Sequence, residues 1–321
     1  MPKCSICDKD NNHTTFQIKE MMFGSGESFE YFSCDNCGCL QISSTPENLS
    51  KYYPTDYYSY TLKPLYKKSK LSRFLAYNRN NYFLFKKNLL GWILGKIHTN
   101  PNLEIVSHAG IDKNARVLDV GCGIGHLLYS MKLSGMKNLL GIDPFIEKDL
   151  HYENGLSILK TEIENVEGGW DLIMLNHVLE HIEHQHQMLA AIYTKLNPGG
   201  CCLIRIPTVS GFAWEHYKEN WVQLDAPRHL FLHSLKSITL LSQKNGFEIE
   251  NVIYDSTEFQ FIGSEQYIKN ISLSSNSSYL TNPDKSIFKR DDIQRYKKDA
   301  KKLNAEKKGD QFSIFLRKPL S

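Results

Sequence analysis

Long apolar runs are missing from this sequence of 321 residues. No stretch of about 18 or more apolar residues occurs in it, so we expect no membrane-spanning helix. The first ten residues, MPKCSICDKD, also lack the apolar centre of a secretory signal, which predicts a cytoplasmic protein. In that compartment the eight cysteines are expected to be thiols or metal ligands rather than disulfides.

Strong charge of either sign is missing as well. The formal net charge is +3, which is too small to make nucleic acid the expected partner. Within residues 57–103, however, there is no Asp or Glu, and aromatic and basic side chains are frequent. The basic ones are Lys63, Lys67, Lys68, Lys70, Arg73, Arg79, Lys86, Lys87 and Lys96. Such a surface could bind a nucleotide diphosphate or an anionic membrane, or it could be the solvated side of helices packed on the next domain.

Composition divides the chain into three parts. Residues 1–45 hold five of the eight cysteines, residues 46–105 are a helical connector rich in Tyr, Lys and Asn, and residues 106–321 form one large domain. In the large domain, short β-like runs alternate with helical stretches, as in βαβ units. We expect inserts at 208–233 and 255–310, a turn at 197–200 and seven strands. The strands are predicted at 116–120, 138–142, 156–159, 171–175, 201–206, 247–254 and 311–317.

A glycine-rich loop follows the first of these strands. Residues 117–125 read VLDVGCGIG, with Gly121, Gly123 and Gly125 at alternate positions and Asp119 two residues before them. Glycine lets the backbone turn sharply and lets a ligand approach without meeting a Cβ atom. The helix that follows offers unpaired N–H donors. The spacing differs from the G-x-G-x-x-G pattern of dinucleotide-binding proteins.

An acidic residue ends the second strand. Asp143 stands in the sequence Gly-Ile-Asp-Pro, at the sheet edge where ribose hydroxyls lie in nucleotide-binding α/β folds. Its carboxylate can accept hydrogen bonds from both hydroxyls. The loop and this acid together predict a site for a nucleoside cofactor.

Two further motifs complete a family resemblance. The fourth strand runs into WDLIMLNHVLEHI at residues 170–182, and LNPGG follows at 196–200. With the glycine loop and Asp143, these motifs resemble class I S-adenosylmethionine-dependent methyltransferases over roughly residues 109–254, with the last strand included. The resemblance implies a seven-stranded Rossmann-like α/β sheet with an antiparallel last strand.

The same resemblance implies S-adenosylmethionine as the cofactor and assigns its contacts. Asp143 would hold the ribose, and an acid after the third strand would meet the adenine, with Glu162 as the best match and Glu164 as the alternative. The other cofactor-binding residues are expected to be Asp119, Gly121, Gly123, Gly125 and Asn176.

Histidines and a glutamate gather after the fourth strand. His177, Glu180 and His181 can converge there, and His229 follows in the 208–233 insert. Methyl transfer requires an aligned nucleophile and, for a hydroxyl or carbon acid, removal of its proton. We therefore expect His181 or His229 as the base, with Glu180 beside it.

Two alternatives stay open for this group. A similar E-x-x-E-H pattern with a distant His binds a divalent metal in the small-RNA 2′-O-methyltransferases. Here His177 replaces the first Glu of that pattern, while Glu180 and His181 match it. The segment could also be an ordinary helix start. The insert around it is rich in aromatic and polar residues that suit either the wall of a sugar pocket or a packed cap. These are Trp214, His216, Tyr217, Trp221, Asp225, Arg228 and His229.

The N-terminal cysteines form two C-x-x-C pairs. Cys4 and Cys7 are followed, after 26 residues, by Cys34 and Cys37. Four thiolates complete the tetrahedral shell of zinc and leave no open position, so we predict a structural Zn2+ site. Cys39 is a competing ligand, but the spacing favours Cys37. A zinc module before a class I domain resembles the methyltransferases of deoxysugar and cell-surface glycan pathways.

These expectations combine into one predicted activity. It is methyl transfer from S-adenosylmethionine to a hydroxyl or carbon of a sugar that is nucleotide-linked or part of a surface-glycan precursor. The alternative is an RNA or tRNA methyltransferase that holds RNA with the zinc module and the basic connector. A third possibility is a scaffold protein that has lost catalysis. The intact glycine loop and Asp143 argue against it. No prediction follows about oligomeric state.

Overall fold

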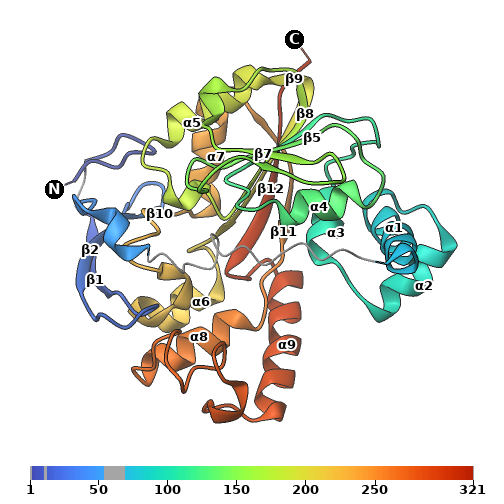
Figure 1. Ribbon diagram of the computed structural model, residues 1–321. Coiled ribbons are helices and arrows are strands. Elements are labelled where there is room, and N and C mark those ends of the chain that lie inside the picture. The colour runs from blue at the N-terminus through green and yellow to red at the C-terminus, as the bar shows by residue number, and fades with distance from the viewer. Residues whose placement is uncertain (1, 11–12, 54–68, 321) are drawn as a thin grey trace.

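The chain begins with a small antiparallel sheet (Figure 1). The computed structural model describes residues 2–10, 13–53 and 69–320. Strands β1 (Thr14–Lys19) and β2 (Ser28–Ser33) form a hairpin, and β3 (Leu40–Ile42) pairs with β2. The fourth strand is β10 (Phe231–Leu232), which comes from the 208–233 insert of the large domain. The N-terminal segment and the insert therefore share one sheet, in the order β1-β2-β3-β10.

Three helices follow in the connector, and side-chain caps set where each begins. Helix α1 (Lys70–Phe85) begins after Ser69, whose Oγ accepts a hydrogen bond from the Ser72 N–H. Asn88 and Asn100 cap α2 (Leu89–Ile97) and α3 (Pro101–Ser107) in the same way. Helices thus make up most of residues 70–107, which overlap the predicted connector of residues 46–105 and extend two residues past it. Residues 54–68 lie outside the described ranges.

A large mixed sheet forms the second part of the chain. Its order is β11-β12-β9-β8-β4-β5-β7-β6, and β12 (Gln311–Arg317) lies antiparallel between its two neighbours. All seven predicted strands are present, and the two-residue β6 is an eighth that the sequence pattern did not predict. The other strands are β4 (Val117–Val120), β5 (Leu139–Ile142), β6 (Leu150–His151), β7 (Ser157–Leu159), β8 (Trp170–Asn176), β9 (Leu196–Pro207) and β11 (Glu248–Tyr254).

One predicted boundary is wrong. Residues 197–200 were expected to be a turn before the fifth strand, but β9 already begins at Leu196, which pairs with Trp170. The register then shifts, so that Cys201 pairs with Leu172. The Asn-Pro-Gly-Gly segment is thus an irregularity inside the strand, where Gly199 takes a positive φ of 73°.

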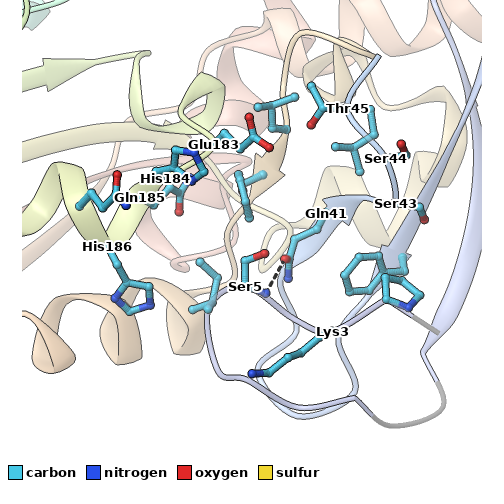
Figure 2. Close-up of a pocket in the computed structure, with 17 residues that line it drawn as sticks. Lys3, Ser5, Gln41, Ser43, Ser44, Thr45, Glu183, His184, Gln185 and His186 are labelled. Atoms are coloured by element: carbon cyan, nitrogen blue, oxygen red, sulfur yellow. Dashed lines mark hydrogen bonds between the residues drawn. The ribbon is translucent and has the colours of Figure 1, made fainter. Parts of the chain in front are cut away.

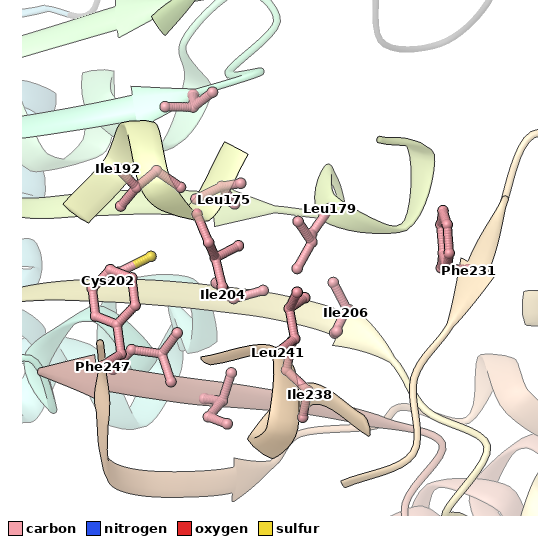
Figure 3. Packing of buried hydrophobic residues seen from close by; sticks show 14 of the residues in the cluster. Leu175, Leu179, Ile192, Cys202, Ile204, Ile206, Phe231, Ile238, Leu241 and Phe247 are labelled. Carbon is pink, nitrogen blue, oxygen red and sulfur yellow. The ribbon is translucent and has the colours of Figure 1, made fainter. Parts of the chain in front are cut away.

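Helices cover both faces of the sheet, as the alternation of side chains requires. In β8, Leu172 and Met174 pack on one face with α3 and α4 (His126–Lys132). Ile173 and Leu175 pack on the other. There they meet α5 (Gln185–Lys195) and α7 (Leu235–Lys244), and Figure 3 shows this second cluster. The sheet therefore holds its carboxyl-end loops on a core that is apolar on both sides.

The two inserts add helices beside the sheets. The first contributes α6 (Phe212–Tyr217), and the second contributes α8 (Phe259–Ile268) and α9 (Arg290–Ala305). Trp214, Tyr217 and Trp221 of the first insert are buried together with side chains of the N-terminal sheet, so these aromatics form a packed cap. In the ranges described, no helix has the length and apolarity needed to cross a membrane.

Candidate active site

The glycine loop joins β4 to α4, and two of its positions accept only glycine. Gly121 and Gly125 have φ values of 66° and 79°. A Cβ atom at Gly121 would lie 2.6 Å from Val178 Cγ2, and one at Gly125 would lie 2.5 Å from Ile158 Cδ1. Gly123 also has a positive φ, of 54°. The loop therefore turns tightly beneath its neighbours and presents backbone rather than side chains at the sheet edge.

Two acids lie against this loop. Asp143 accepts hydrogen bonds from the Gly123 N–H at 2.8 Å (Oδ2) and the Phe145 N–H at 2.9 Å (Oδ1). Asn176 Nδ2 lies 3.4 Å from Asp119 Oδ1. Burial raises the pKa of Asp119 to about 7, and the charge of Asp143 adds to the rise while Asn176 opposes it. The predicted residues Asp119, Asp143 and Asn176 thus meet at the loop, with oxygen lone pairs left for ligand hydroxyls.

The predicted adenine contact lies apart from this group. Glu162 follows β7 at the same edge of the sheet, and its side chain is exposed, as is that of Glu164. Both carboxylates are exposed to solvent, so exposure does not distinguish Glu162 from Glu164 as the adenine contact.

A second group of side chains begins directly after Val178, which packs on Gly121. The turn Leu179–His181 places Glu180 and His181 beside His229 of the insert. One ligand atom from each of the three lies within 4.8 Å of the others, and the His181 and His229 ring centroids are 4.7 Å apart. The three residues predicted as catalytic therefore come together, next to the glycine loop.

Comparison with known proteins agrees with this geometry. Residues 97–252 match a family model described as a methyltransferase domain. This segment, just under half of the chain, carries a methyltransferase domain. The domain is similar to the mitochondrial ubiquinone biosynthesis O-methyltransferase of Saccharomyces cerevisiae, with 28% identity over 127 residues, which are 36% of this chain and 41% of that protein.

Two further relatives are named for ubiquinone biosynthesis and for tRNA. The ubiquinone biosynthesis O-methyltransferase of Rickettsia bellii is 24% identical over 183 residues, 51% of this chain and 76% of that protein. The tRNA U34 carboxymethyltransferase of Alteromonas mediterranea is 25% identical over 171 residues, 47% and 50% of the two chains. A methyltransferase structure from Archaeoglobus fulgidus has a TM-score of 0.42 at 17% identity and covers 72% of this chain and all of that one. That TM-score is too low to support a conclusion.

Hydrogen bonds fix the tautomers of both histidines in the methyltransferase site. His181 Nδ1 lies 2.8 Å from the Arg228 carbonyl oxygen, and His229 Nδ1 lies 2.7 Å from the Gln223 carbonyl oxygen. A carbonyl oxygen only accepts, so each Nδ1 carries a proton, and the Nε2 of a neutral ring keeps its lone pair. Burial and the neighbouring His181 lower the pKa of His229 to about 4, so its ring is neutral at pH 7.

Glu180 is the unusual member of the group. Its side chain is fully buried, and among the described residues neither carboxylate oxygen has a hydrogen-bond partner. His177 Nδ1 lies 3.4 Å from Oε1. Burial alone would raise the pKa of Glu180, but His177, His181 and His229 lower it to about 2. A buried carboxylate of this kind stabilises positive charge beside it, either on an imidazolium or on a bound divalent cation.

Arg228, which the sequence predicts only as part of a pocket wall or a packed cap, connects this site to the N-terminal sheet. The guanidinium is fully buried, and Nη2 lies 2.7 Å from Asp225 Oδ1 and 2.9 Å from Glu20 Oε1. Its Nη1 donates to the Tyr52 carbonyl oxygen at 3.1 Å. Because the Arg228 carbonyl holds His181, the N-terminal segment helps to position a predicted catalytic residue. No sequence signal marks Glu20, which lies in a turn after β1.

Aromatic hydroxyls from the same segment also reach the site. Tyr31 Oη donates to the His229 carbonyl oxygen at 2.8 Å, and Tyr53 Oη lies 3.3 Å from His181 Nδ1. Tyr53 belongs to a tyrosine-rich segment, residues 52–60, of which residues 54–60 lie outside the described ranges.

The four predicted metal-ligating cysteines also converge. The Sγ atoms of Cys4 and Cys37 are 3.6 Å apart, and those of Cys7 and Cys34 are 3.5 Å apart. In a tetrahedral zinc site with Zn–S bonds of about 2.3 Å, sulfur atoms lie about 3.8 Å apart. All four sulfur atoms lie within 4.8 Å of one another, so they could surround one metal ion. The Sγ of Cys39 instead lies 4.0 Å from His233 Nδ1 and is not one of the four.

Helix α7 of the methyltransferase domain holds the two cysteine turns. Ser234 Oγ donates to the Cys37 carbonyl oxygen, Lys236 Nζ to that of Asn36, and Lys244 Nζ to that of Ile6. Gln41 Nε2 donates to Cys4 Sγ at 3.0 Å. These contacts orient the turns from outside, as second-sphere groups do around metal sites.

A cavity of about 570 Å³ lies between the cysteine turns and the beginning of α5 (Figure 2). Polar side chains line it, among them Lys3, Ser43, Thr45, His184 and His186. None of its lining residues is a predicted cofactor-binding or catalytic residue, although Leu230 and Phe231 follow His229 directly. The cavity is therefore next to the candidate active site rather than part of it.

Proposed function

We propose that the protein transfers the methyl group of S-adenosylmethionine to a hydroxyl or carbon of a sugar-containing small molecule. The observation that carries the proposal is the pair of Nε2 lone pairs on His181 and His229, next to the glycine loop. The bound cofactor would supply an electrophilic methyl group on its sulfonium. This chain must then orient the acceptor and remove one proton.

The roles of the residues follow from their surroundings. Asp119, Asn176, Asp143 and the loop backbone would hold the cofactor, with Glu162 near the adenine. His229 is neutral and desolvated, so its Nε2 can take a proton from an acceptor hydroxyl. The buried charge of Glu180 then stabilises the imidazolium that forms. The same three side chains could hold a divalent cation, because both histidines donate Nδ1–H to a carbonyl, as metal-ligating histidines do.

The acceptor class rests on two features. The relatives named as O-methyltransferases support a hydroxyl acceptor. A sugar is supported by the four-cysteine module in front of the methyltransferase domain, an arrangement that resembles the methyltransferases of deoxysugar and cell-surface glycan pathways. The alternative, RNA, is supported by the relatives named for tRNA and by the basic connector.

We also propose a structural zinc ion on Cys4, Cys7, Cys34 and Cys37. It would hold the N-terminal module of residues 1–45 on α7 and, through Glu20 and Arg228, on the active site. Elemental analysis of the purified protein is expected to give one zinc per chain. A purified, folded protein without zinc would contradict this assignment.

Methyl transfer can be tested with a donor that carries a deuterated methyl group. Nucleotide sugars, sugar-free phenols and tRNA are offered as acceptors, and products are identified by mass spectrometry. We expect label on a nucleotide sugar or glycan precursor with wild type. Asp143→Ala, which weakens ribose binding, should lower the yield at limiting donor and recover at high donor. Label on tRNA alone would support the alternative, and absence of cofactor binding in calorimetry would overturn both.

A further inference from the structure

Large apolar side chains on the surface are concentrated in one small part of the described chain. Sixteen large hydrophobic residues are exposed, and nine of them lie between residues 71 and 97. They are Leu71, Phe74, Leu75 and Tyr77 on α1 and Leu89, Leu90, Trp92, Ile93 and Ile97 on α2. The exposed fraction reaches 74% for Leu89 and 69% for Ile97. Such a concentration of exposed apolar side chains on two neighbouring helices is typical of an interaction site.

The packing of α2 explains why these side chains face outward. The helix contacts α1 through its two glycines, since a Cβ at Gly91 would lie 2.2 Å from the Asn78 carbonyl oxygen and one at Gly95 would lie 3.2 Å from Phe83 Cζ. Because the small residues take the inner face, the large residues of α2 are left on the outer face at helical spacing. This is the reverse of a helix whose apolar face covers a core.

The hairpin that carries this surface is firmly held by the methyltransferase domain. Asn80 Nδ2 donates to the Ser130 carbonyl oxygen at 2.9 Å, and Asn81 Nδ2 donates to that of Ser134 at 3.1 Å. Phe83 and Leu84 are buried in the core beneath the sheet. In Figure 1, α1 and α2 stand beside α4, on the side opposite the N-terminal sheet. The apolar surface is therefore a fixed feature of the fold.

Positive charge surrounds the apolar residues. Lys70, Arg73, Lys87 and Lys96 are exposed, and no acid occurs from residue 57 to residue 103. Lys96 Nζ lies 3.7 Å from the centre of the Trp92 ring. The surface therefore combines aliphatic residues, an interfacial tryptophan and unopposed basic charge.

We propose that the outer face of the α1–α2 hairpin binds the surface of an anionic phospholipid bilayer. Acyl chains can take up the aliphatic side chains, while lipid phosphates neutralise the lysines. A second copy of this face would bring like charges together without an acid to pair with them. RNA would satisfy the charge but would leave Leu89, Ile93 and Ile97 in water, since bases stack on aromatic rings. Helix α2 is too short to span the bilayer, so binding is at the interface.

Vesicle cosedimentation tests the proposal without any acceptor, so its outcome is independent of the proposed function. The full-length protein is mixed with vesicles of phosphatidylcholine alone or with added phosphatidylglycerol. We expect binding to the vesicles that contain phosphatidylglycerol, weakening as salt rises because the charges are screened. No binding by folded protein would overturn the proposal.

Two variants separate the apolar and electrostatic contributions. Leu89→Glu with Ile97→Glu changes the two most exposed large apolar residues of α2. The double variant should lower the partition coefficient from water to the vesicles roughly tenfold or more. Leu280→Glu, at another exposed leucine, is the apolar control and should bind like wild type. Lys87→Glu with Lys96→Glu should abolish the preference for phosphatidylglycerol, whereas Lys298→Glu with Lys301→Glu on α9 should keep it.

Circular dichroism confirms that each variant is folded, and two further measurements distinguish other partners. Analytical ultracentrifugation detects self-association, and fluorescence anisotropy detects tRNA binding. A dimer or a tRNA complex that the Leu89 and Ile97 variant loses, without any vesicle binding by wild type, would overturn the proposal in favour of that partner.

Discussion

Two groups of potential metal ligands in this protein differ in almost every physical respect. The first has four cysteine thiols from two turns, with the spacing of a tetrahedral shell and no position left open. The second has one carboxylate and two imidazoles, on a turn and an insert beside the cofactor loop. Only the second has a buried charge without a hydrogen-bond partner among the described residues.

The contrast separates a group that holds the fold from one suited to chemistry. Side chains at the two ends of α7 donate hydrogen bonds to backbone carbonyls of the cysteine turns. The free energy of metal binding would therefore stabilise the junction between the N-terminal module and the domain. The Glu180 group has unused lone pairs on two histidines, which is what a proton acceptor or an open metal site requires. The predictions below address each side of this comparison.

The largest effect is expected at the cysteine group. Cys37→Ser should remove the zinc ion and lower the free energy of unfolding by several kcal/mol, because binding energy at such a site is folding energy. Metal content and thermal unfolding measure the effect. Cys39→Ala is the matched control and should keep its zinc. If Cys37→Ser bound a full equivalent of zinc, the four-cysteine assignment would be wrong.

At the second group the expected effect is on rate. His229→Ala should lower kcat roughly 10²–10⁴-fold, since it removes the proton acceptor, while donor affinity changes little. Calorimetry with S-adenosylmethionine and steady-state kinetics measure the two quantities separately. His216→Ala, at an exposed histidine of the same insert, is the control. A kcat within about twofold of wild type would exclude His229 as the base.

The connection between the two groups can be tested at Glu20. Glu20→Gln weakens a buried ion pair with Arg228 and should cost about 1–3 kcal/mol of stability, because Asp225 still neutralises the guanidinium. A positioning role predicts in addition a lower kcat in the folded variant, with recovery in Glu20→Asp. If stability alone changed, the residue would be purely structural.

The smallest effect concerns pH and Asp119. The pKa of this acid is raised from 3.8 to about 7 in the folded, unliganded protein, so the folded state keeps the proton that the unfolded chain has lost. Stability from this group is present below pH 3.8 and falls as pH rises toward 7. The positively charged donor should bind the ionised form better, so its affinity should rise severalfold as pH passes about 7. Calorimetry across this range should show no such rise in Asp119→Asn.

Local patterns in the sequence sufficed for the large sheet and the cofactor loop. The strands of the sheet are buried apolar runs bounded by turns, which the sequence pattern predicts. The glycines of residues 121–125 stand where the loop has positive φ values, with no room for a Cβ atom at Gly121 and Gly125, so the motif itself marks the tight turn. The two-residue β6 was missed because such a short strand has no periodicity. The boundary at Leu196 was wrong because residues 197–200 were predicted as a turn before the fifth strand, whereas they are an irregularity within it.

Contacts between distant parts of the chain had no such signal. Glu20 and Arg228 are 208 positions apart, and neither looks special among its neighbours. The pairing of Gln41 with Phe231 likewise depends on how the insert lies on the N-terminal sheet. The members of the catalytic group could be listed from the sequence, but the backbone carbonyls that set their tautomers could not.

The pairing of β3 with β10 has a consequence for how the protein is made. The edge of β3 pairs with residues 231–232, which are synthesised after six of the eight strands of the large sheet. Until then the first sheet has an open edge that can pair with another nascent chain. Folding of the amino-terminal end therefore depends on late synthesis, and a fragment ending before the insert should aggregate where the whole chain does not.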